Sequence, residues 1–362
     1  YTTSRGATYN AYLIRDEKTA LIDTVKYLYA ATLEKNVAAL TDVKKIAYLV
    51  CNHAEPDHSS GFPHMVRACP NAEIVCDAKC QDAMSKHYDT AGWKWKLVKT
   101  GDSLKLGKRS LSFIETPLVH WPESMFTYCP EEELLFSMDG FGQHFASAHR
   151  FDDEVNLDEG LFEAKKYFAN IVMLYGPRIA KLLEAAAAMK IKMIAPAHGV
   201  IWRSHIPAIV KAYSEWVVCK AKPKVMAVFD SMWGSTELMA RAIAEGASLP
   251  GVEVKVLGVR QNDVTDLTAD LLDAAAIAFG SATLNQGMMP AMAGLLTYWK
   301  GLKPVGKCGF AFGSYGWGKG GSEAVHEWIK GMDIEVLREP IRANYRPTPQ
   351  VLEECRAAGK LL

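Results

Sequence analysis

The first part of the chain alternates short apolar runs with polar turns, a pattern typical of β-strands. Residues 9–15 and 19–23 flank the polar turn Asp16-Glu17-Lys18 and predict a hairpin. Helical stretches such as residues 179–189 separate some of the later runs. Together these elements predict two packed sheets with helices outside them. The further predicted strands are residues 45–51, 72–76, 95–98, 110–115, 124–129, 133–137 and 193–195.

After Pro223 the pattern becomes a regular alternation of apolar strands and helices. Strands that are apolar throughout and alternate with helices are typical of a parallel, doubly wound sheet with both faces covered. We therefore predict two domains, residues 1–222 and residues 223–362. The predicted strands are residues 224–229, 252–257, 274–279, 309–313 and 335–341, and the predicted helices are residues 238–247, 267–272, 292–299 and 322–330.

Composition and charge exclude several classes of protein. The 362 residues carry 41 basic and 41 acidic side chains, so nothing suggests the basic surface of a nucleic-acid-binding protein. No apolar run approaches the roughly 18–20 residues of a membrane span, and no membrane association is expected. The eight cysteines are scattered and form no C-x-x-C pair, which favours a reducing, cytoplasmic location over a disulfide scaffold.

A dense group of polar residues follows the strand predicted at residues 45–51. His53, Glu55, Asp57 and His58 place two imidazoles and two carboxylates within one short segment. Alternate residues of an extended segment point the same way, so His53 and Glu55 can share one metal ion while the next pair turns towards a second. Buried carboxylates are costly unless they are paired or bound to metal. The alternative interpretation of this segment is a solvated charged loop.

Three later residues favour the metal site over that alternative. His120, Asp139 and His198 each come shortly after a predicted strand and have turn residues beside them. Loops at one edge of a sandwich can converge, and the carboxylate of Asp139 is suited to bridging two cations. The sequence therefore predicts a two-metal site.

The second domain contains three loops that each follow a strand. Ligands bind beyond the carboxyl ends of strands in a doubly wound sheet, and a hydroxyl-rich turn at a helix N-terminus can hold a phosphate. For the first loop alone, an ordinary helix cap is the alternative. The predicted contacts are Ser231, Met232, Trp233, Gly234, Ser235 and Thr236 in the first loop, Ser281, Ala282, Thr283, Leu284 and Asn285 in the second, and Ser314, Tyr315, Gly316, Trp317 and Gly318 in the third.

The metal motif resembles the H-x-[HE]-x-D-H motif of the metallo-β-lactamase superfamily, and the three later loops resemble the FMN loops of flavodoxins. Glu55 stands where the hydrolases of that superfamily have histidine, and its hard anionic oxygen favours iron over zinc. The H-x-E-x-D variant, followed by the flavin loops, resembles the flavodiiron proteins (A-type flavoproteins) over nearly the whole chain. One departure is Ala282, where the family usually has proline.

The resemblance implies an N-terminal metallo-β-lactamase-like αββα sandwich, a C-terminal flavodoxin-like domain, FMN and a non-haem di-iron pair. His53, Glu55 and His120 would hold one iron, Asp57 and His198 the other, and Asp139 would bridge them. His58 would either bind iron or be displaced by solvent. Tyr167 matches a tyrosine that lines the metal pocket in similar proteins and could donate a hydrogen bond there, although the residue taken alone is better explained as a packed aromatic.

The implied function is that of a terminal reductase, in which FMN passes electrons to the irons and O2 is reduced to water, NO to N2O, or both. A rubredoxin or similar small protein would donate the electrons to a head-to-tail homodimer, or to a dimer of such dimers. The shape of the pocket and the hydrogen bonds around it decide the balance between O2 and NO. The alternatives are a dizinc hydrolase with an accessory flavodoxin domain, and a non-catalytic electron carrier or gas sensor.

Overall fold

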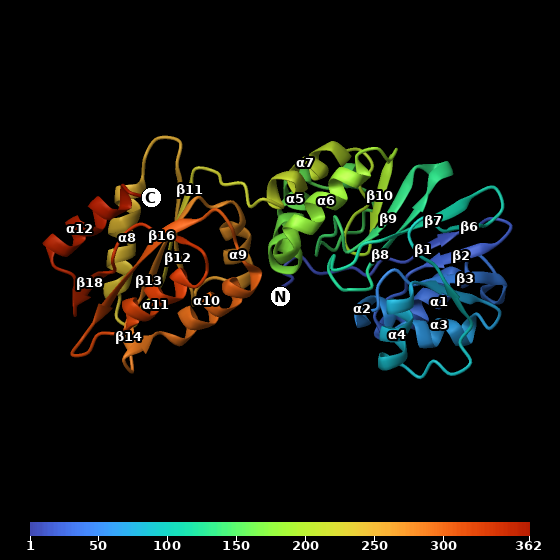
Figure 1. The fold of residues 1–362 in the computed structure, drawn as a ribbon, viewed down its shortest axis with the longest axis horizontal. Coiled ribbons are helices and arrows are strands. Elements are labelled where there is room, and N and C mark those ends of the chain that lie inside the picture. The colour runs from blue at the N-terminus through green and yellow to red at the C-terminus, as the bar shows by residue number, and fades with distance from the viewer. The chain divides into compact units, whose positions relative to one another are not determined.

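The computed structural model describes residues 1–362 and divides them into two units, each with its own core (Figure 1). The sandwich unit comprises Thr3–Tyr167 and Pro177–Ser214, and the parallel-sheet unit comprises Glu215–Leu362, Phe168–Gly176 and Tyr1–Thr2. The predicted domain boundary at residue 222 stays a prediction.

The sandwich unit contains the two sheets that the sequence predicts. Their strands run in the orders β1-β2-β3-β4-β5 and β10-β9-β8-β7-β6, and β1 and β2 form the predicted antiparallel hairpin. The first sheet contains β1 (Tyr12–Ile14), β2 (Thr19–Ile22), β3 (Ile46–Val50), β4 (Glu73–Cys76) and β5 (Trp95–Leu97). The second contains β6 (Ser103–Lys105), β7 (Ser110–Glu115), β8 (Met125–Cys129), β9 (Leu134–Met138) and β10 (Met193–Pro196).

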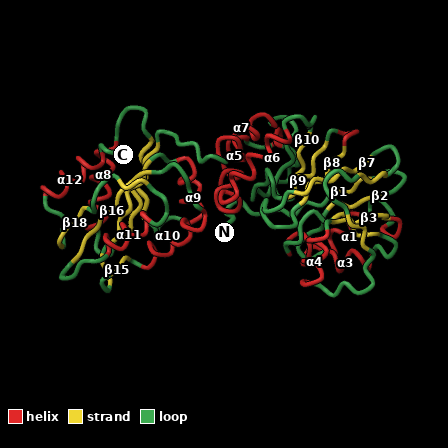
Figure 2. Tube along the Cα trace, viewed as in Figure 1, coloured by secondary structure: helices red, strands yellow, loops and turns green.

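Alternation along the strands divides the sandwich core into two layers. Ile22 and Val50 pack between the sheets with Phe113 of β7, whereas their neighbours Leu21 and Leu49 pack against helices on the outer face. Strands therefore lie inside and helices outside (Figure 2). The helices are α1 (Ala30–Ala38), α2 (Pro56–Ser59), α3 (Phe62–Ala68), α4 (Ala78–His87), α5 (Leu157–Tyr167), α6 (Gly176–Ala186) and α7 (Ile206–Trp216).

The parallel-sheet unit has the strand order of a flavodoxin-like fold, β12-β11-β13-β16-β17, with β18 also paired to β16. All of these pairs are parallel. The strands are β11 (Lys224–Asp230), β12 (Glu253–Gly258), β13 (Ala276–Ser281), β16 (Cys308–Tyr315), β17 (Glu335–Val336) and β18 (Ile341–Asn344), with a separate hairpin of β14 (Thr283–Leu284) and β15 (Gly287–Met288). The helices are α8 (Ser235–Ala247), α9 (Val264–Asp273), α10 (Pro290–Leu302), α11 (Gly321–Lys330) and α12 (Pro349–Gly359).

The prediction of one last strand over residues 335–341 is wrong. The structure has two short strands there, β17 and β18, which pair with different parts of β16. Pro340 lies between them and has no N–H group to donate to a neighbouring strand, so a continuous strand is disfavoured. Apolar character alone did not reveal this break.

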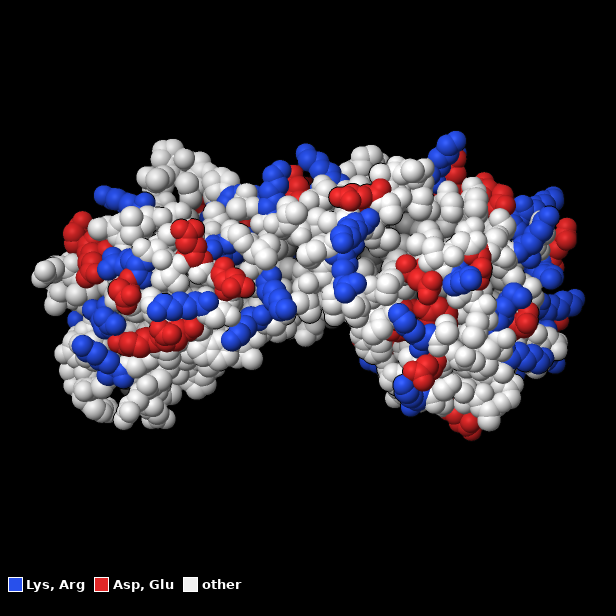
Figure 3. Space-filling model, viewed as in Figure 1, with Lys and Arg blue, Asp and Glu red and all other residues white.

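Charges of both signs occur on the visible face of the molecule, where acidic and basic side chains are interspersed (Figure 3). None of the helices combines the length and the apolar character that crossing a bilayer requires.

Helices α8 and α12 cover one face of the parallel sheet and touch each other through glycines. A Cβ atom placed on Gly246 of α8 would lie 2.0 Å from the carbonyl oxygen of Arg356, and one on Gly359 of α12 would lie 2.1 Å from that of Ile243. Only glycine permits this approach of two backbones. The contact holds α12 over a core that includes Phe310 of β16.

We predict that Gly246→Ala destabilises the parallel-sheet unit by about 1–3 kcal/mol, because the added methyl group forces the two helices apart. Gly294→Ala in α10 is the matched control, since no atom lies within 4 Å of the Cβ position there. It should stabilise the protein by up to about 1 kcal/mol through helix propensity. Both changes are measured by unfolding the protein in denaturant and monitoring the fluorescence of FMN as it is released. Equal effects of the two substitutions would contradict the packing argument.

Candidate metal and flavin sites

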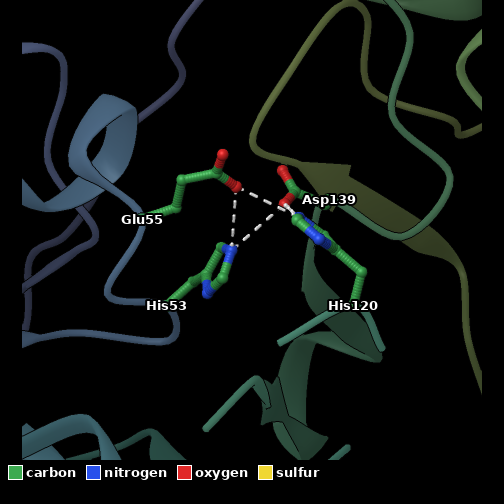
Figure 4. Close-up of side chains that lie close together, drawn as sticks. All are labelled: His53, Glu55, His120 and Asp139. Atoms are coloured by element: carbon green, nitrogen blue, oxygen red, sulfur yellow. Dashed lines mark hydrogen bonds and ion pairs between the residues drawn. The ribbon is translucent and has the colours of Figure 1, made fainter. Parts of the chain in front are cut away.

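The first metal cluster contains four of the predicted ligands, His53, Glu55, His120 and Asp139 (Figure 4). One ligand atom from each lies within 4.8 Å of the others. The Nε2 atom of His120 is 3.1 Å from Glu55 Oε2 and 2.9 Å from Asp139 Oδ2. The Nε2 atom of His53 is 3.2 Å from the same oxygen of Glu55. Two imidazoles and two carboxylates thus face one point, as a transition-metal ion requires.

The second cluster contains Asp57, His58 and His198, whose ligand atoms also lie within 4.8 Å of one another. The Nε2 atoms of His58 and His198 are 3.1 and 3.3 Å from Asp139 Oδ1. Asp139 therefore turns one carboxylate oxygen to each cluster, which is the geometry of a bridging ligand. His58, whose role the sequence left open, lies inside this cluster.

Local backbone geometry aims these side chains. Pro56 starts the short helix α2 directly after Glu55, so the extended segment ends there and Asp57 and His58 turn towards the second cluster. Asp139 follows Met138, whose φ angle of 53° lies in the left-handed region. A non-glycine residue in that region is disfavoured, and such residues gather at functional sites.

Two groups that orient the cluster histidines escaped the sequence analysis. Glu123 lies 2.7 Å from Nδ1 of His53, and the carbonyl oxygen of Thr8 lies 2.6 Å from Nδ1 of His198. Partners at the second ring nitrogen fix the orientation of a metal-binding histidine. No motif or strand end marks either residue, and only the folded chain brings them to the site.

Tyr167 ends α5 beside the second cluster. Its buried ring is 5.0 Å from that of His144 and 5.8 Å from that of His198, measured between centroids. Burial raises the pKa of Tyr167, and the nearby carboxylate of Asp139 raises it further, so its hydroxyl stays protonated. Burial likewise lowers the pKa of His144 to about 4, which leaves a neutral imidazole against His198.

Burial and ion pairing shift the pKa values of the metal-site residues in opposite directions. Burial favours neutral His120, but its hydrogen bonds to Asp139 and Glu55 outweigh burial and raise its pKa to about 9. Burial would raise the pKa of Glu55, yet His120 and His53 lower it to about 2. In the protein without metal, protons on the imidazoles therefore balance the carboxylates. A metal ion would displace those protons and take over their charge.

The predicted phosphate loop follows β11 and leads into α8. The hydroxyl of Ser231 accepts a hydrogen bond from the N–H of Gly234, whose φ angle is 82° and whose Cβ position has no atom within 4 Å. This open cradle at the N-terminus of a long helix suits a phosphate. Met232 is exposed, and Trp233 beside it is 89% exposed, so an aromatic face is free to contact a ligand.

The other two loops follow β13 and β16 at the same edge of the sheet, and several of their polar groups are engaged within the protein. Ser281 is buried and its hydroxyl accepts from the N–H of Met289, while Thr236 and Ser314 share a hydrogen bond. The side chains of Ser281, Thr236 and Ser314 therefore stabilise the conformation of the loops. Trp317 is 97% exposed. The remaining predicted contacts are buried Ala282, partly buried Thr283, Leu284, Tyr315, Gly316 and Gly318, and exposed Asn285.

Arg260, which the sequence analysis did not single out, lies at the start of the phosphate loop. Its Nε atom is 2.8 Å from Oδ1 of buried Asp230, and its guanidinium also donates to the carbonyl oxygen of Ser231. It brings a positive charge to the loop that is predicted to bind a phosphate. The sequence alone does not place Arg260 near this loop, because Arg260 follows β12 and comes close to the loop only through the pairing of β12 with β11.

Comparisons with known proteins agree with this geometry. Residues 7–199 match the family described as "ODP family beta lactamase", and residues 228–359 match the flavodoxin family. The chain is 42% identical to a nitric oxide reductase of Moorella thermoacetica, covering 99% of this chain and 91% of that protein. It is 38% identical to a rubredoxin-oxygen oxidoreductase of Megalodesulfovibrio gigas, covering 100% and 91%.

Solved structures lead to the same class of protein. The flavodiiron protein of Giardia intestinalis matches with a TM-score of 0.96 at 40% identity, covering 100% of this chain and 90% of that one. The rubredoxin oxygen:oxidoreductase of Desulfovibrio gigas matches with a TM-score of 0.96 at 38% identity, covering 99% and 90%. The chain therefore belongs to the flavodiiron proteins, a family of oxidoreductases. The predicted metallo-β-lactamase-like and flavodoxin-like folds are confirmed, as are FMN and a di-iron pair as cofactors.

We predict that the metal-free protein loses stability as the pH rises through about 9. A raised histidine pKa means that protonation favours the folded state, so this contribution is complete below pH 6.5 and is lost on passing the folded pKa, about 9 for His120. Thermal unfolding of chelator-treated protein measures the change. The iron-loaded protein is the control, because its imidazoles are held by metal and should show little of this loss. Parallel pH profiles for both forms would contradict the prediction.

Proposed function

We propose that this protein is a terminal reductase that takes electrons from a small redox protein and reduces O2 to water, NO to N2O, or both. The observation that carries the proposal is the bridging position of Asp139 between two ligand clusters, in a chain that also has three flavodoxin-type loops. When bound, FMN supplies a port for electrons and the di-iron pair supplies the site of reduction.

We assign the metal ligands residue by residue. His53, Glu55 and His120 hold one iron, and Asp139 bridges to the other. Asp57, His58 and His198 hold the second iron. Contact distances of His58 like those of His198 support its inclusion. The rings of Tyr167 and His144 lie beside the second cluster, and the protonated hydroxyl of Tyr167 would be available there as a hydrogen-bond donor.

We assign FMN to the carboxyl edge of the parallel sheet, in a domain that begins at residue 223. Gly234 and the N-terminus of α8 would hold its phosphate, helped by the charge of Arg260, and the exposed rings of Trp233 and Trp317 would be available to contact the flavin. The names of the relatives, rubredoxin-oxygen oxidoreductase and flavorubredoxin, support a rubredoxin as the electron donor. All eight cysteines are free thiols, which supports a reducing, cytoplasmic location.

The decisive experiment is anaerobic reduction of the protein followed by separate stopped-flow mixing with O2 and with NO. We expect rapid oxidation of the flavin by at least one of the two gases, with water or N2O as the product. Asp139→Ala should lose or disorder both irons, because it removes the shared ligand, while FMN stays bound. Rapid reduction of either gas therefore disappears in this variant.

Metal analysis and a matched variant separate this proposal from its alternatives. Asp152→Asn changes a buried carboxylate that accepts from main-chain N–H groups away from the clusters, so it should keep its irons. Two zinc ions per chain with an inert flavin would favour the hydrolase instead. Unchanged iron content in Asp139→Ala would overturn the bridging assignment.

We further propose a head-to-tail homodimer in which the flavin end of one chain covers the metal end of the other. Tyr27, Leu28 and Tyr29 form an exposed apolar ridge, of which Leu28 is 62% exposed. The N–H of Tyr27 donates to the hydroxyl of Ser60 just after α2, so the ridge lies beside the metal segment. The exposed indole of Trp317 at the flavin loops is a fitting counterpart. Closed two-fold dimers are the commonest oligomers.

We predict that Leu28→Asp shifts the dimer towards monomer and slows the transfer of electrons from FMN to the irons, because it places a charge in an apolar interface. Sedimentation measures the first effect, and flavin oxidation in stopped flow measures the second. Leu97→Asp is the control, since Leu97 is also exposed but lies on β5 in the same unit. A monomeric wild-type protein, or equal effects of the two variants, would rule out this interface.

A further inference from the structure

The two metal clusters differ in the groups that hold the outer nitrogens of their histidines. Nδ1 of His53 in the first cluster lies 2.7 Å from the carboxylate of Glu123. Nδ1 of His198 in the second cluster lies 2.6 Å from the main-chain carbonyl oxygen of Thr8. The first partner carries a negative charge and the second is neutral. The two clusters are therefore not electrostatically equivalent.

Glu123 is built into the site without reaching the metal position. It is 3% exposed and lies between β7 and β8, and the oxygen that contacts His53 also accepts from the N–H of Ala54 at 3.1 Å. The ring of Trp121 stands edge-on to the imidazole of His53, with 5.1 Å between centroids. Glu123 is absent from the set of ligand atoms that face one point. Its role must therefore pass through His53.

The charge of Glu123 creates an asymmetry that the ligands alone do not have. Each cluster has one carboxylate of its own, Glu55 in the first and Asp57 in the second, and both share Asp139. Glu123 places a buried carboxylate at the outer nitrogen of His53 in the first cluster, whereas the outer nitrogen of His198 in the second meets the neutral carbonyl of Thr8. A carboxylate hydrogen-bonded to a metal-binding imidazole makes that imidazole a stronger donor. Stronger, more anionic donation favours the higher oxidation state of iron.

We propose that Glu123 is a positioning residue that orients His53 and makes the iron held by His53, Glu55 and His120 the first of the two to be oxidised. The inference rests on the ligand assignment proposed above. Removal of one electron from the fully reduced pair then leaves a ferric ion in the first cluster and a ferrous ion in the second. In the test below, ferricyanide takes that electron.

The test is a redox titration of the iron-loaded protein, followed by electron paramagnetic resonance of the half-oxidised state. Glu123→Gln keeps the shape of the side chain and an oxygen that can accept from His53, but it removes the charge. We expect this variant to keep both irons, with a raised potential for the first oxidation step and a smaller change in the second. The window in which the half-oxidised signal appears should narrow accordingly.

A second variant and a matched control separate the effect of the charge of Glu123 from the effect of its hydrogen bond to His53. Glu123→Ala removes the hydrogen bond as well and should weaken metal binding about 10–100-fold in chelator competition. Asp152→Asn is the control, because Asp152 is also a buried carboxylate that contacts a histidine Nδ1, that of His205 at 3.1 Å, yet His205 belongs to neither cluster. It should leave both potentials and the metal affinity unchanged.

The outcomes distinguish failure of this inference from failure of the proposed function. If Glu123→Gln binds two irons and reduces O2 or NO but has wild-type potentials, the inference is overturned and the proposed function stands. A larger shift in the second step than in the first, or an equal shift in Asp152→Asn, also overturns it. If the wild-type protein binds no iron, the proposed function itself fails.

Discussion

One buried carboxylate ties the sandwich unit together at its functional edge. Asp139 is 2% exposed, and its two oxygens face four imidazoles, those of His53 and His120 on one side and of His58 and His198 on the other. A carboxylate at such depth is costly unless opposite charges compensate it. The histidines hold the pKa of Asp139 well below its usual range although burial opposes this. Loops from both sheets must therefore converge, and the sandwich is the framework that brings them together.

The arrangement of the strands also places the second site. Strands β11, β13 and β16 run parallel, so the loops that follow them meet at one edge of the sheet. Core positions such as Phe310 and glycine contacts such as that of Gly246 keep the helices close, and the loops are left free to bind a ligand. In both units a rigid layer of strands fixes the spacing between the loops, and short loops carry the functional residues.

The sequence predicted most strands and helices because their apolar periodicity is strong, and it predicted the cluster residues because their chemistry is concentrated. It failed where structure depends on pairing between distant segments. The division of residues 335–341 into β17 and β18 depends on two different stretches of β16. The sequence also missed one local element, the short hairpin of β14 and β15, because that hairpin depends on left-handed residues at Asn285 and Gln286, which apolar patterns do not show.

The sequence by itself determined the class of chemistry, because Glu55 within its motif selects hard oxygen ligation and the three later loops select a flavin. Only the tertiary structure decided how these residues act together. It placed His58 against Asp139, and it placed Glu123 behind His53 although 70 positions separate them. Hydrogen bonds between residues so far apart leave no local pattern, since they arise when separate loops pack. The sequence therefore showed which types of metal ligand are present, whereas the fold decided how they are oriented.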